Sequence, residues 1–272
     1  CWYHGFTFNL ESGNLDTIVG NPDDPLIGNT GLTTYPVEEA AGLIFVFVRA
    51  DDYPNEDVPP LAQDLPLRFP ENSERFPHPL WPAAPSLLDD DVVALGIHRT
   101  GEANWRIACE NGFDNAHILV HKDNTIVQSN NWVLPLGIRP ASEDCITVFD
   151  DAEGPKGMMQ WLFTDRWEPI LENKALDVKV EGLNSRLYRT SVILPGVLLV
   201  ENWPEEGVAQ YEWYVPITAD TYEYWEVLVK HCPIEEDKEQ FSYRFDTVYQ
   251  PLALRGFNDC DLHAREAMQD FY

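Results

Sequence analysis

Apolar and polar residues alternate over short stretches near the start of the chain. Phe6, Phe8 and Leu10 alternate with polar neighbours, and a turn-forming cluster at positions 11–14 follows at once. Alternation of this kind is typical of a β-strand with one buried face. Farther along, Leu43–Val48 is apolar at every position, which predicts a buried strand. We therefore expect this part of the chain to be a small all-β module built from short strands and turns.

Prolines dominate the next forty positions. Proline fixes φ and removes a backbone donor, so such a stretch can form little regular structure. We expect residues 51–91 to connect two domains, which would span residues 1–50 and 92–272. The prolines of this connection are Pro54, Pro59, Pro60, Pro66, Pro70, Pro77, Pro79, Pro82 and Pro85.

The remaining residues combine strand-like and helix-like patterns. Runs rich in Tyr, Trp and Val favour β-structure, whereas straight-chain residues favour helices. Strands that follow one another directly indicate an antiparallel sheet, and helices packed on it make the fold class α+β. The expected strands are Cys145–Phe149, Met158–Phe163, Tyr188–Leu194, Val197–Val200, Tyr211–Ile217 and Glu223–Val229. The expected helices are Ala103–Val120, Glu235–Tyr249 and Asp259–Phe271.

Composition narrows the possible classes of function. The 272 residues include 18 Lys and Arg against 46 Asp and Glu, so the formal net charge is −28. Phosphate backbones and anionic lipid surfaces attract cationic proteins, so we expect no nucleic-acid partner and no membrane partner. Hydrophobic residues make up 44% of the chain, enough for a sizeable core. The longest apolar run falls far short of the ~20 residues that a spanning helix needs, and we find no leader pattern.

Cysteine usage and the first residue add two expectations. Five cysteines, odd in number and widely spaced, indicate reduced thiols in a cytoplasmic protein rather than a disulfide framework. The chain opens on Cys inside the patterned segment CWYHGFTFNLESG. We therefore expect it to be a fragment whose N-terminus lies upstream.

Two histidines have the spacing of metal ligands on a helix. His117 and His121 are four residues apart, which places both imidazoles on one helix face. Zinc proteases use the same spacing but carry Glu directly after the first histidine, where this chain has Ile118. Two histidines with one distant carboxylate would instead form the ligand triad of a non-haem Fe(II) oxygenase. A pair of hydrogen-bonded core histidines is the alternative.

A second pattern opens the chain. Cys1 and His4, followed by Gly5, form a Cys-x2-His pair in a strand–turn context. A Rieske cluster takes two Cys ligands on one iron and two His ligands on the other, so half of such a set is visible here. On its own the pair is weak evidence for a cluster, and its other Cys-x-His half would lie upstream.

Three segments in order resemble the motifs of Rieske non-haem iron ring-hydroxylating oxygenases. CWYHGFTFNLESGNL resembles the second half of the Rieske motif, NWRIACENGFDNAHILVHKDN the mononuclear-iron motif, and GFNDCDLHAREAMQDFY the segment that carries the carboxylate ligand. The resemblance extends over essentially the whole chain and is strongest to the homotrimeric branch of the family. It implies a partial, small all-β Rieske domain followed by a helix-grip-like catalytic domain.

The resemblance assigns the ligands of the mononuclear iron. His117 and His121 correspond to the two histidine ligands. Asp261, four residues before Arg265, corresponds to the carboxylate ligand. Two alternatives stay open: Asp261 as a helix-surface carboxylate paired with Arg265, or Asp259 as the true ligand.

The resemblance also assigns four further positions. Asp114 corresponds to the acidic residue that bridges the mononuclear site to the Rieske cluster of the neighbouring subunit, although a helix-capping aspartate is the alternative. Gly112 corresponds to a position whose backbone carbonyl accepts a hydrogen bond from a substrate ring N–H. Cys1 and His4 correspond to the second Rieske pair.

These assignments imply an enzyme, the oxygenase component of an NADH-dependent monooxygenase. The expected cofactors are a Rieske [2Fe-2S] cluster and a mononuclear Fe(II), with NADH used through a separate flavin and iron–sulfur reductase, with or without a ferredoxin. The expected substrate is an aromatic N-heterocycle, 2-oxo-1,2-dihydroquinoline, hydroxylated at C8 with O2. Angular dioxygenation of carbazole-like aromatics is the alternative. We expect a homotrimer, whose acidic surface would attract a basic reductase.

A function of another class stays open. Cys260 and His263 form a second Cys-x2-His pair, which with His117 and His121 could build a closed four-ligand zinc site. The protein would then be a non-catalytic zinc or electron-transfer protein, and metal analysis would separate the two hypotheses.

Overall fold

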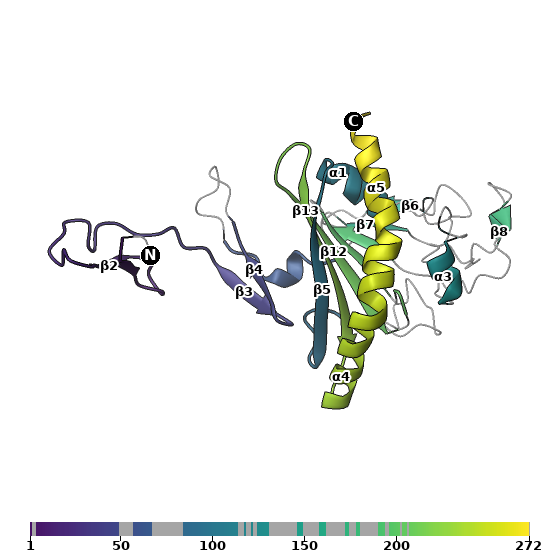
Figure 1. Ribbon diagram of the computed structural model, residues 1–272, viewed down its shortest axis with the longest axis horizontal. Helices are drawn as coiled ribbons and strands as arrows, with labels where there is room; N and C mark the ends of the chain where they lie inside the picture. Colours follow the sequence, from purple (N-terminus) through teal and green to yellow (C-terminus); the bar gives the residue numbers. More distant parts are fainter. Residues whose placement is uncertain are drawn as a thin grey trace. The chain divides into compact units, whose positions relative to one another are not determined.

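The computed structural model (Figure 1) describes residues 1, 4–48, 57–66, 84–113, 117, 121, 124–130, 146–148, 158–161, 172–173, 178–179, 190–193, 196–201, 203–205 and 207–271. The chain divides into two compact units, Cys1–Pro59 and Pro60–Tyr272. The division therefore falls within the proline-rich connection. The domain boundaries at 50 and 91, and the nature of each domain, stay predictions.

The first unit contains two antiparallel strand pairs. β1 (Phe6–Phe8) pairs with β2 (Leu15–Ile18), and β3 (Val37–Ala40) pairs with β4 (Leu43–Val46). Between β1 and β2, the side chain of Asn9 accepts hydrogen bonds from the next turn's backbone N–H groups at 3.0 and 2.9 Å. The short strands and the turn expected here are confirmed.

The burial expected for β4 is wrong. Its residues alternate between half-buried and exposed, and the side chains of Ile44 and Val46 are 72% and 52% exposed. An isolated two-stranded ribbon has two faces, and successive side chains point to opposite ones. In the described residues of this unit, only one face of β4 is covered.

In the described part of the second unit, seven strands form one antiparallel sheet in the order β5-β13-β12-β11-β10-β7-β6. The expected α+β class with an antiparallel sheet is confirmed. A separate pair, β8 (Glu172–Asn173) and β9 (Val178–Lys179), is also antiparallel. The strands of the sheet are β5 (Val92–Gly101), β13 (Tyr222–His231), β12 (Val208–Pro216), β11 (Val197–Glu201), β10 (Thr190–Ile193), β7 (Met158–Trp161) and β6 (Ile146–Val148).

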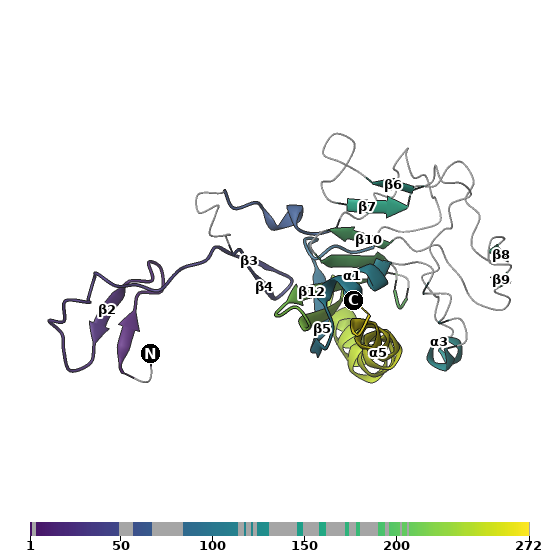
Figure 2. The same cartoon turned by 90° about the horizontal axis from the view of Figure 1, so that it is seen from above.

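One long helical column packs on one face of this sheet (Figures 1 and 2). It consists of α4 (Glu235–Arg244), the π-helical segment η4 (Phe245–Phe257) and α5 (Asn258–Gln269) without a break. The expectation of two separate helices is wrong, because η4 continues the helix through Pro251. Proline cannot donate an i→i−4 hydrogen bond, and a π-helical segment is a common way to accommodate such a disruption.

Shorter helices cover other parts of the unit. α1 (Trp105–Phe113) confirms the first half of the helix expected over Ala103–Val120. It begins after Asn104, whose side-chain oxygen accepts a hydrogen bond from the backbone N–H of Arg106 at 2.9 Å, as an N-cap does. The other short elements are η1 (Leu61–Gln63) in the proline-rich connection and α3 (Thr125–Ser129). None of the described helices is both long and apolar enough to cross a membrane.

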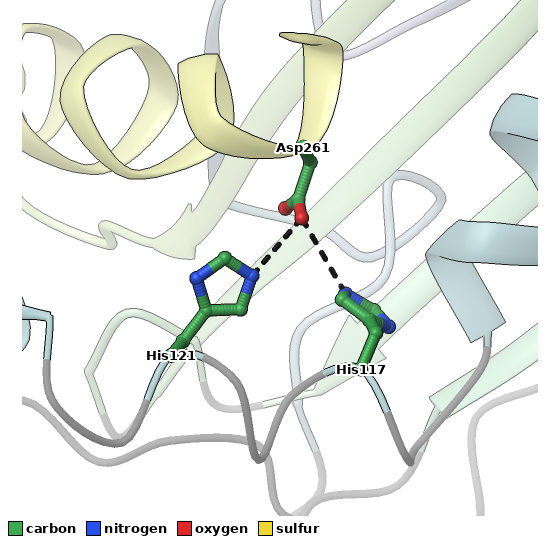
Figure 3. A group of neighbouring side chains, drawn as sticks. All are labelled: His117, His121 and Asp261. Carbon is green, nitrogen blue, oxygen red and sulfur yellow. Dashed lines mark hydrogen bonds and ion pairs between the residues drawn. The ribbon is translucent and has the colours of Figure 1, made fainter. Parts of the chain in front are cut away.

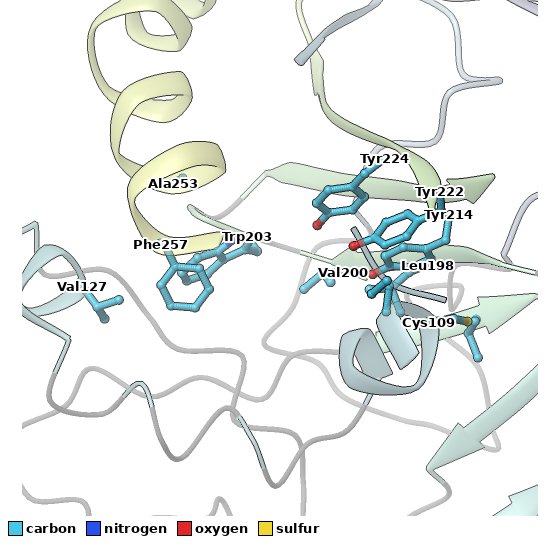
Figure 4. Packing of buried hydrophobic residues seen from close by; sticks show 13 residues of the cluster. Cys109, Val127, Leu198, Val200, Trp203, Tyr214, Tyr222, Tyr224, Ala253 and Phe257 are labelled. Atoms are coloured by element: carbon cyan, nitrogen blue, oxygen red, sulfur yellow. The ribbon is translucent and has the colours of Figure 1, made fainter. Parts of the chain in front are cut away.

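The core lies between the sheet and these helices (Figure 4). Trp203 packs against Phe257 of the column, with ring centroids 5.0 Å apart. Tyr214, Tyr222 and Tyr224 fill the other end of the same cluster, and each is at most 2% exposed. Burial of this aromatic surface stabilises the interface between the sheet and the helices, and so fixes the position of α5 on the sheet.

Candidate metal centre

Three side chains with metal-ligand chemistry converge beside the column, at the start of α5 (Figure 3). His117 and His121 follow α1, and Asp261 lies in the first turn of α5. One ligand atom from each, two imidazole nitrogens and a carboxylate oxygen, lie within 4.8 Å of one another. The side chains are 15%, 7% and 9% exposed, in the same order.

The carboxylate faces both imidazoles. Asp261 Oδ1 is 3.0 Å from His121 Nε2 and 3.8 Å from His117 Nε2. The two imidazole rings are 5.6 Å apart and almost perpendicular, at 86°. Ligand atoms at right angles around one metal lie about 3 Å apart when each metal–ligand bond is about 2.1 Å. The donor set therefore fits three ligands on one side of a mononuclear iron, and the Asp261–His121 separation already has the expected length.

The electrostatics favour a charged carboxylate at this position. Burial would raise the pKa of Asp261, but the hydrogen bond with His121 and the positive charges of Arg265 and His117 outweigh it, so the pKa is lowered. A carboxylate must be ionised to bind a metal. Asp261 meets that requirement at neutral pH.

The helix that carries Asp261 also explains why it is buried. Asn258, Asp261 and Arg265 are the buried residues of α5, and their spacing of three and four places them on one helix face. Phe257, at the end of η4, packs against His121 with ring centroids 4.4 Å apart. The face of the column that packs on the sheet thus also presents the carboxylate to the histidines.

The neighbouring candidates on α5 lie elsewhere. Asp259 is exposed, and its carboxylate forms an ion pair with Arg99. Cys260 and His263 are also exposed, and neither belongs to the group of candidate ligands found in the described part of the chain. Asp261 as a whole residue is 6% exposed, so the alternative that it is a helix-surface carboxylate is wrong.

Cys1 and His4 lie on one turn in the first unit. The backbone N–H of Gly5 donates to the carbonyl of Cys1 at 3.0 Å, and Gly5 has a φ of +69°, which favours glycine. Cys1 and His4 are both exposed. Within the described residues, no third potential ligand forms a group with them. They can supply two of the four ligands of a Rieske cluster, and their role as the second pair stays a prediction.

The two remaining predicted positions differ in what the structure says of them. Asp114 lies outside the described residues, so its bridging role stays a prediction. Gly112 lies in α1, where a Cβ atom would overlap the hydroxyl of Tyr214 and approach Leu198 Cδ2 to 3.0 Å. A glycine is therefore needed for α1 to pack on β11 and β12, and the expected contact of its carbonyl with substrate stays a prediction.

A buried polar network that the sequence patterns did not predict lies beneath the site. Glu212, at 5% exposure, accepts hydrogen bonds from the hydroxyls of Tyr224, at 2.6 Å, and Tyr214. Burial, and next the charge of Glu212, raise the pKa values of both tyrosines. The guanidinium of Arg265 lies 5.4 and 5.1 Å from the ring centroids of Tyr214 and Tyr224.

A second part of this network joins β5 and β13 to the column. Arg99 donates to Glu226 Oε2 through Nε at 3.0 Å and Nη2 at 2.6 Å, and Asn258 donates to Glu226 Oε1. The detectable signal is a period of two: in β12, Glu212 shares a strand face with Tyr214, and in β13, Glu226 shares a face with Tyr222 and Tyr224. A charged residue at an inward-facing strand position indicates a buried pair.

The family match, the related sequences and the solved structures all point to one protein family. The family of homotrimeric ring hydroxylases matches residues 53–272. The terminal oxygenase component of carbazole 1,9a-dioxygenase from Metapseudomonas resinovorans is 38% identical over 279 residues, which cover 100% of this chain and 66% of that protein.

Two solved structures extend the likeness. The 2-oxoquinoline 8-monooxygenase component, described with a Rieske [2Fe-2S] centre, is 70% identical with a TM-score of 0.83, over 100% of this chain and 64% of that one. The complex between oxygenase and ferredoxin in carbazole 1,9a-dioxygenase matches with 36% identity and a TM-score of 0.75, over 100% of this chain and 65% of that one. The chain thus spans less than two thirds of the length of these relatives.

Proposed function

The chain belongs to the family of homotrimeric ring hydroxylases, and on that premise we propose that it is part of the terminal oxygenase component of an NADH-dependent Rieske monooxygenase. The observation that carries the proposal is the convergence of His117, His121 and Asp261, whose ligand atoms lie within 4.8 Å. Two imidazoles and one carboxylate leave about half of an octahedral shell open, as an oxygenase requires.

We propose that these three residues hold Fe(II). When bound, the iron supplies the activation of dioxygen, which no protein side chain provides. Asp261 contributes the negative charge that offsets the charge of the metal, and the lowered pKa keeps it ionised. Phe257, packed 4.4 Å from the ring of His121, restricts the rotation of that imidazole and keeps water from one side of it.

The electron supply would come from outside the described site. Cys1 and His4 would hold one iron each of a Rieske [2Fe-2S] cluster, completed by a Cys-x-His pair outside this chain. Asp114 would accept hydrogen bonds that join the mononuclear site to the cluster of the next subunit in a homotrimer. Reduction by a flavin and iron–sulfur reductase through a ferredoxin is supported by the ferredoxin complex of the carbazole relative and by the net charge of −28, which favours a basic partner.

The proposed substrate is 2-oxo-1,2-dihydroquinoline, hydroxylated at C8. Support comes from the 70% identity to the 2-oxoquinoline 8-monooxygenase component, against 38% to the carbazole oxygenase. The Gly112 carbonyl would accept a hydrogen bond from the ring N–H and so select the carbon that faces iron. Angular dioxygenation of carbazole-like aromatics is the second candidate, favoured by the relatives of that specificity.

A closed zinc site finds no such support. It requires Cys260 to point at His117 and His121, yet Cys260 is exposed and Asp261 occupies that side of α5. A structural zinc site normally excludes solvent with four ligands.

The test of the proposal is product analysis with the full-length protein and its reductase. We expect 2-oxo-1,2-dihydroquinoline to give a monohydroxylated product with one atom of labelled dioxygen, and carbazole to give little product. A dihydroxylated carbazole as the main product would favour the second candidate. Absence of turnover with both, in a protein that binds zinc and no iron, would contradict the proposal.

A further inference from the structure

Arg265 occupies an unusual position for an arginine. It lies one helical turn after Asp261 in α5 and is 3% exposed. Its guanidinium is within cation–π distance of Tyr214 and Tyr224, at 5.4 and 5.1 Å from their ring centroids. A fully buried arginine is costly unless it is paired or stacked, so this placement has a structural reason.

Two tyrosines of the sheet form a fixed surface on which the guanidinium of Arg265 packs. Tyr214 in β12 and Tyr224 in β13 are directly opposite each other, and their rings stack at 5.3 Å with an angle of 8°. Both hydroxyls donate to the buried carboxyl of Glu212. Because two neighbouring strands and one acid hold these rings, the guanidinium has a definite place relative to the sheet.

The same arginine also reaches the helix that leads to the histidines. Arg265 Nε donates to Asn111 Oδ1 at 2.7 Å. Asn111 lies in the last full turn of α1, six residues before His117. One side chain thus joins the helix that carries Asp261, the sheet beneath it, and the helix that precedes the two histidines.

We propose that Arg265 is a positioning residue for the metal centre: by joining α5, α1 and the tyrosine pair, it sets the separation between Asp261 and the histidine pair. The inference rests on the proposed metal site. Because the three ligands come from segments about 140 residues apart, holding their separation in place before the metal binds strengthens the binding of one ion. Lysine cannot replace this function, because a single ammonium cannot stack on the rings and reach Asn111 with a planar fork.

The experiment measures metal binding directly, in the full-length protein freed of mononuclear iron. Co(II) serves as the probe, because its visible spectrum reports ligand geometry. For Arg265→Lys, we expect Co(II) affinity to fall at least tenfold and the Co(II) spectrum to change, while the Rieske absorbance stays the same. Asn111→Ala should reproduce the loss, and Asn111→Asp, which keeps the acceptor oxygen, should restore affinity to within about threefold of the parent.

Arg244→Lys is the matched control. Arg244 also lies over a tyrosine, with its guanidinium 5.2 Å from the ring centroid of Tyr249, and it pairs with Glu205. It belongs to α4 and contacts neither α1 nor a ligand in the described residues. Its replacement should lower stability without changing Co(II) affinity or spectrum.

The outcomes separate this inference from the proposed function. If the parent binds no Co(II), or if binding survives His117→Ala, the metal site itself is wrong and the positioning role falls with it. If the parent binds through His117 but Arg265→Lys binds Co(II) as tightly and with the same spectrum, only the positioning role is refuted. Should Arg265→Lys fail to fold, an unchanged affinity in Asn111→Ala refutes that role in the same way.

Discussion

Asp261 in α5 and Glu226, which is bonded to α5 through Asn258, are both buried carboxyl groups, at 6% and 0% exposure, and their pKa values shift in opposite directions. The pKa of Asp261 is lowered, whereas burial raises the pKa of Glu226 to about 8. At Asp261, the hydrogen bond with His121 and the nearby positive charges outweigh burial. At Glu226, the charge of Arg99 opposes burial without cancelling it, and the charge of Glu212 adds to the rise.

The difference separates a ligand from a structural acid. A carboxylate binds a metal in its ionised form, and the hydrogen bond with His121 and the charge of Arg265 favour that form at Asp261. Glu226 instead holds β5, β13 and α5 together through Arg99 and Asn258, and it can do so with or without its proton. The following predictions test this contrast, in order of expected effect.

The largest effect is expected for the ligands. His121→Ala and Asp261→Ala should abolish turnover and mononuclear iron binding in the full-length protein, because each removes one of three ligands. The Rieske absorbance should stay intact, and iron content is measured by metal analysis. Asp259→Ala is the matched control, since Asp259 is exposed and paired with Arg99; it should keep its iron. The reverse pattern in the two aspartate variants would show that Asp259 is the ligand.

A stability effect without loss of metal is expected at the structural acid. Arg99→Met removes the partner of a fully buried carboxyl and should lower the free energy of unfolding by about 3 kcal/mol. Iron content should change by less than about twofold, because Arg99 makes no contact with His117, His121 or Asp261 in the described residues. Urea unfolding and metal analysis give the two values. A loss of iron as large as that in His121→Ala would mean that the Arg99–Glu226 pair and the metal ligands depend on one another.

The smallest effect, taken per pH unit, concerns the pH dependence of stability. Because the pKa of Glu226 is about 8 in the folded protein and about 4.3 when unfolded, the folded state binds more protons between these values. The free energy of unfolding should therefore fall as pH rises through this range, by up to about 1.4 kcal/mol per unit. Glu226→Gln, which resembles the protonated acid, should remove this slope in urea unfolding of chelator-treated protein. An identical slope in parent and variant would contradict the raised pKa.

Asp261 should respond with the opposite sign. Its lowered pKa contributes stability that is present above the unfolded value of about 3.9 and is lost as pH falls through the folded value. We therefore expect the free energy of unfolding to be highest at a pH above the range in which Asp261 takes up its proton and below the range in which Glu226 loses its proton.

Local patterns along the chain were sufficient for part of the fold and of the site. The i, i+4 spacing of His117 and His121 predicts a ligand pair, and runs rich in Tyr, Trp and Val located most strands of the sheet. Strand β5 was missed because Gly96, His98 and Arg99 interrupt its apolar pattern. It nevertheless pairs along its whole length with β13, since backbone hydrogen bonds and a long neighbouring strand can override a weak local preference.

The order of amino acids specifies which residue types are available for metal chemistry, but it leaves three adjacent candidates on α5. Asp259, Cys260 and Asp261 differ by about 100° of helix rotation each, and spacing along the chain cannot say which one faces a histidine 140 residues earlier. The choice depends on tertiary packing, because the contact of α5 with the sheet fixes the rotation of the helix. Asn258 and Arg265 are turned inward to buried partners, and Asp261 lies on the face between them. The same packing decides the charge of Asp261, since the imidazoles and the guanidinium that lower its pKa come together only in the folded chain.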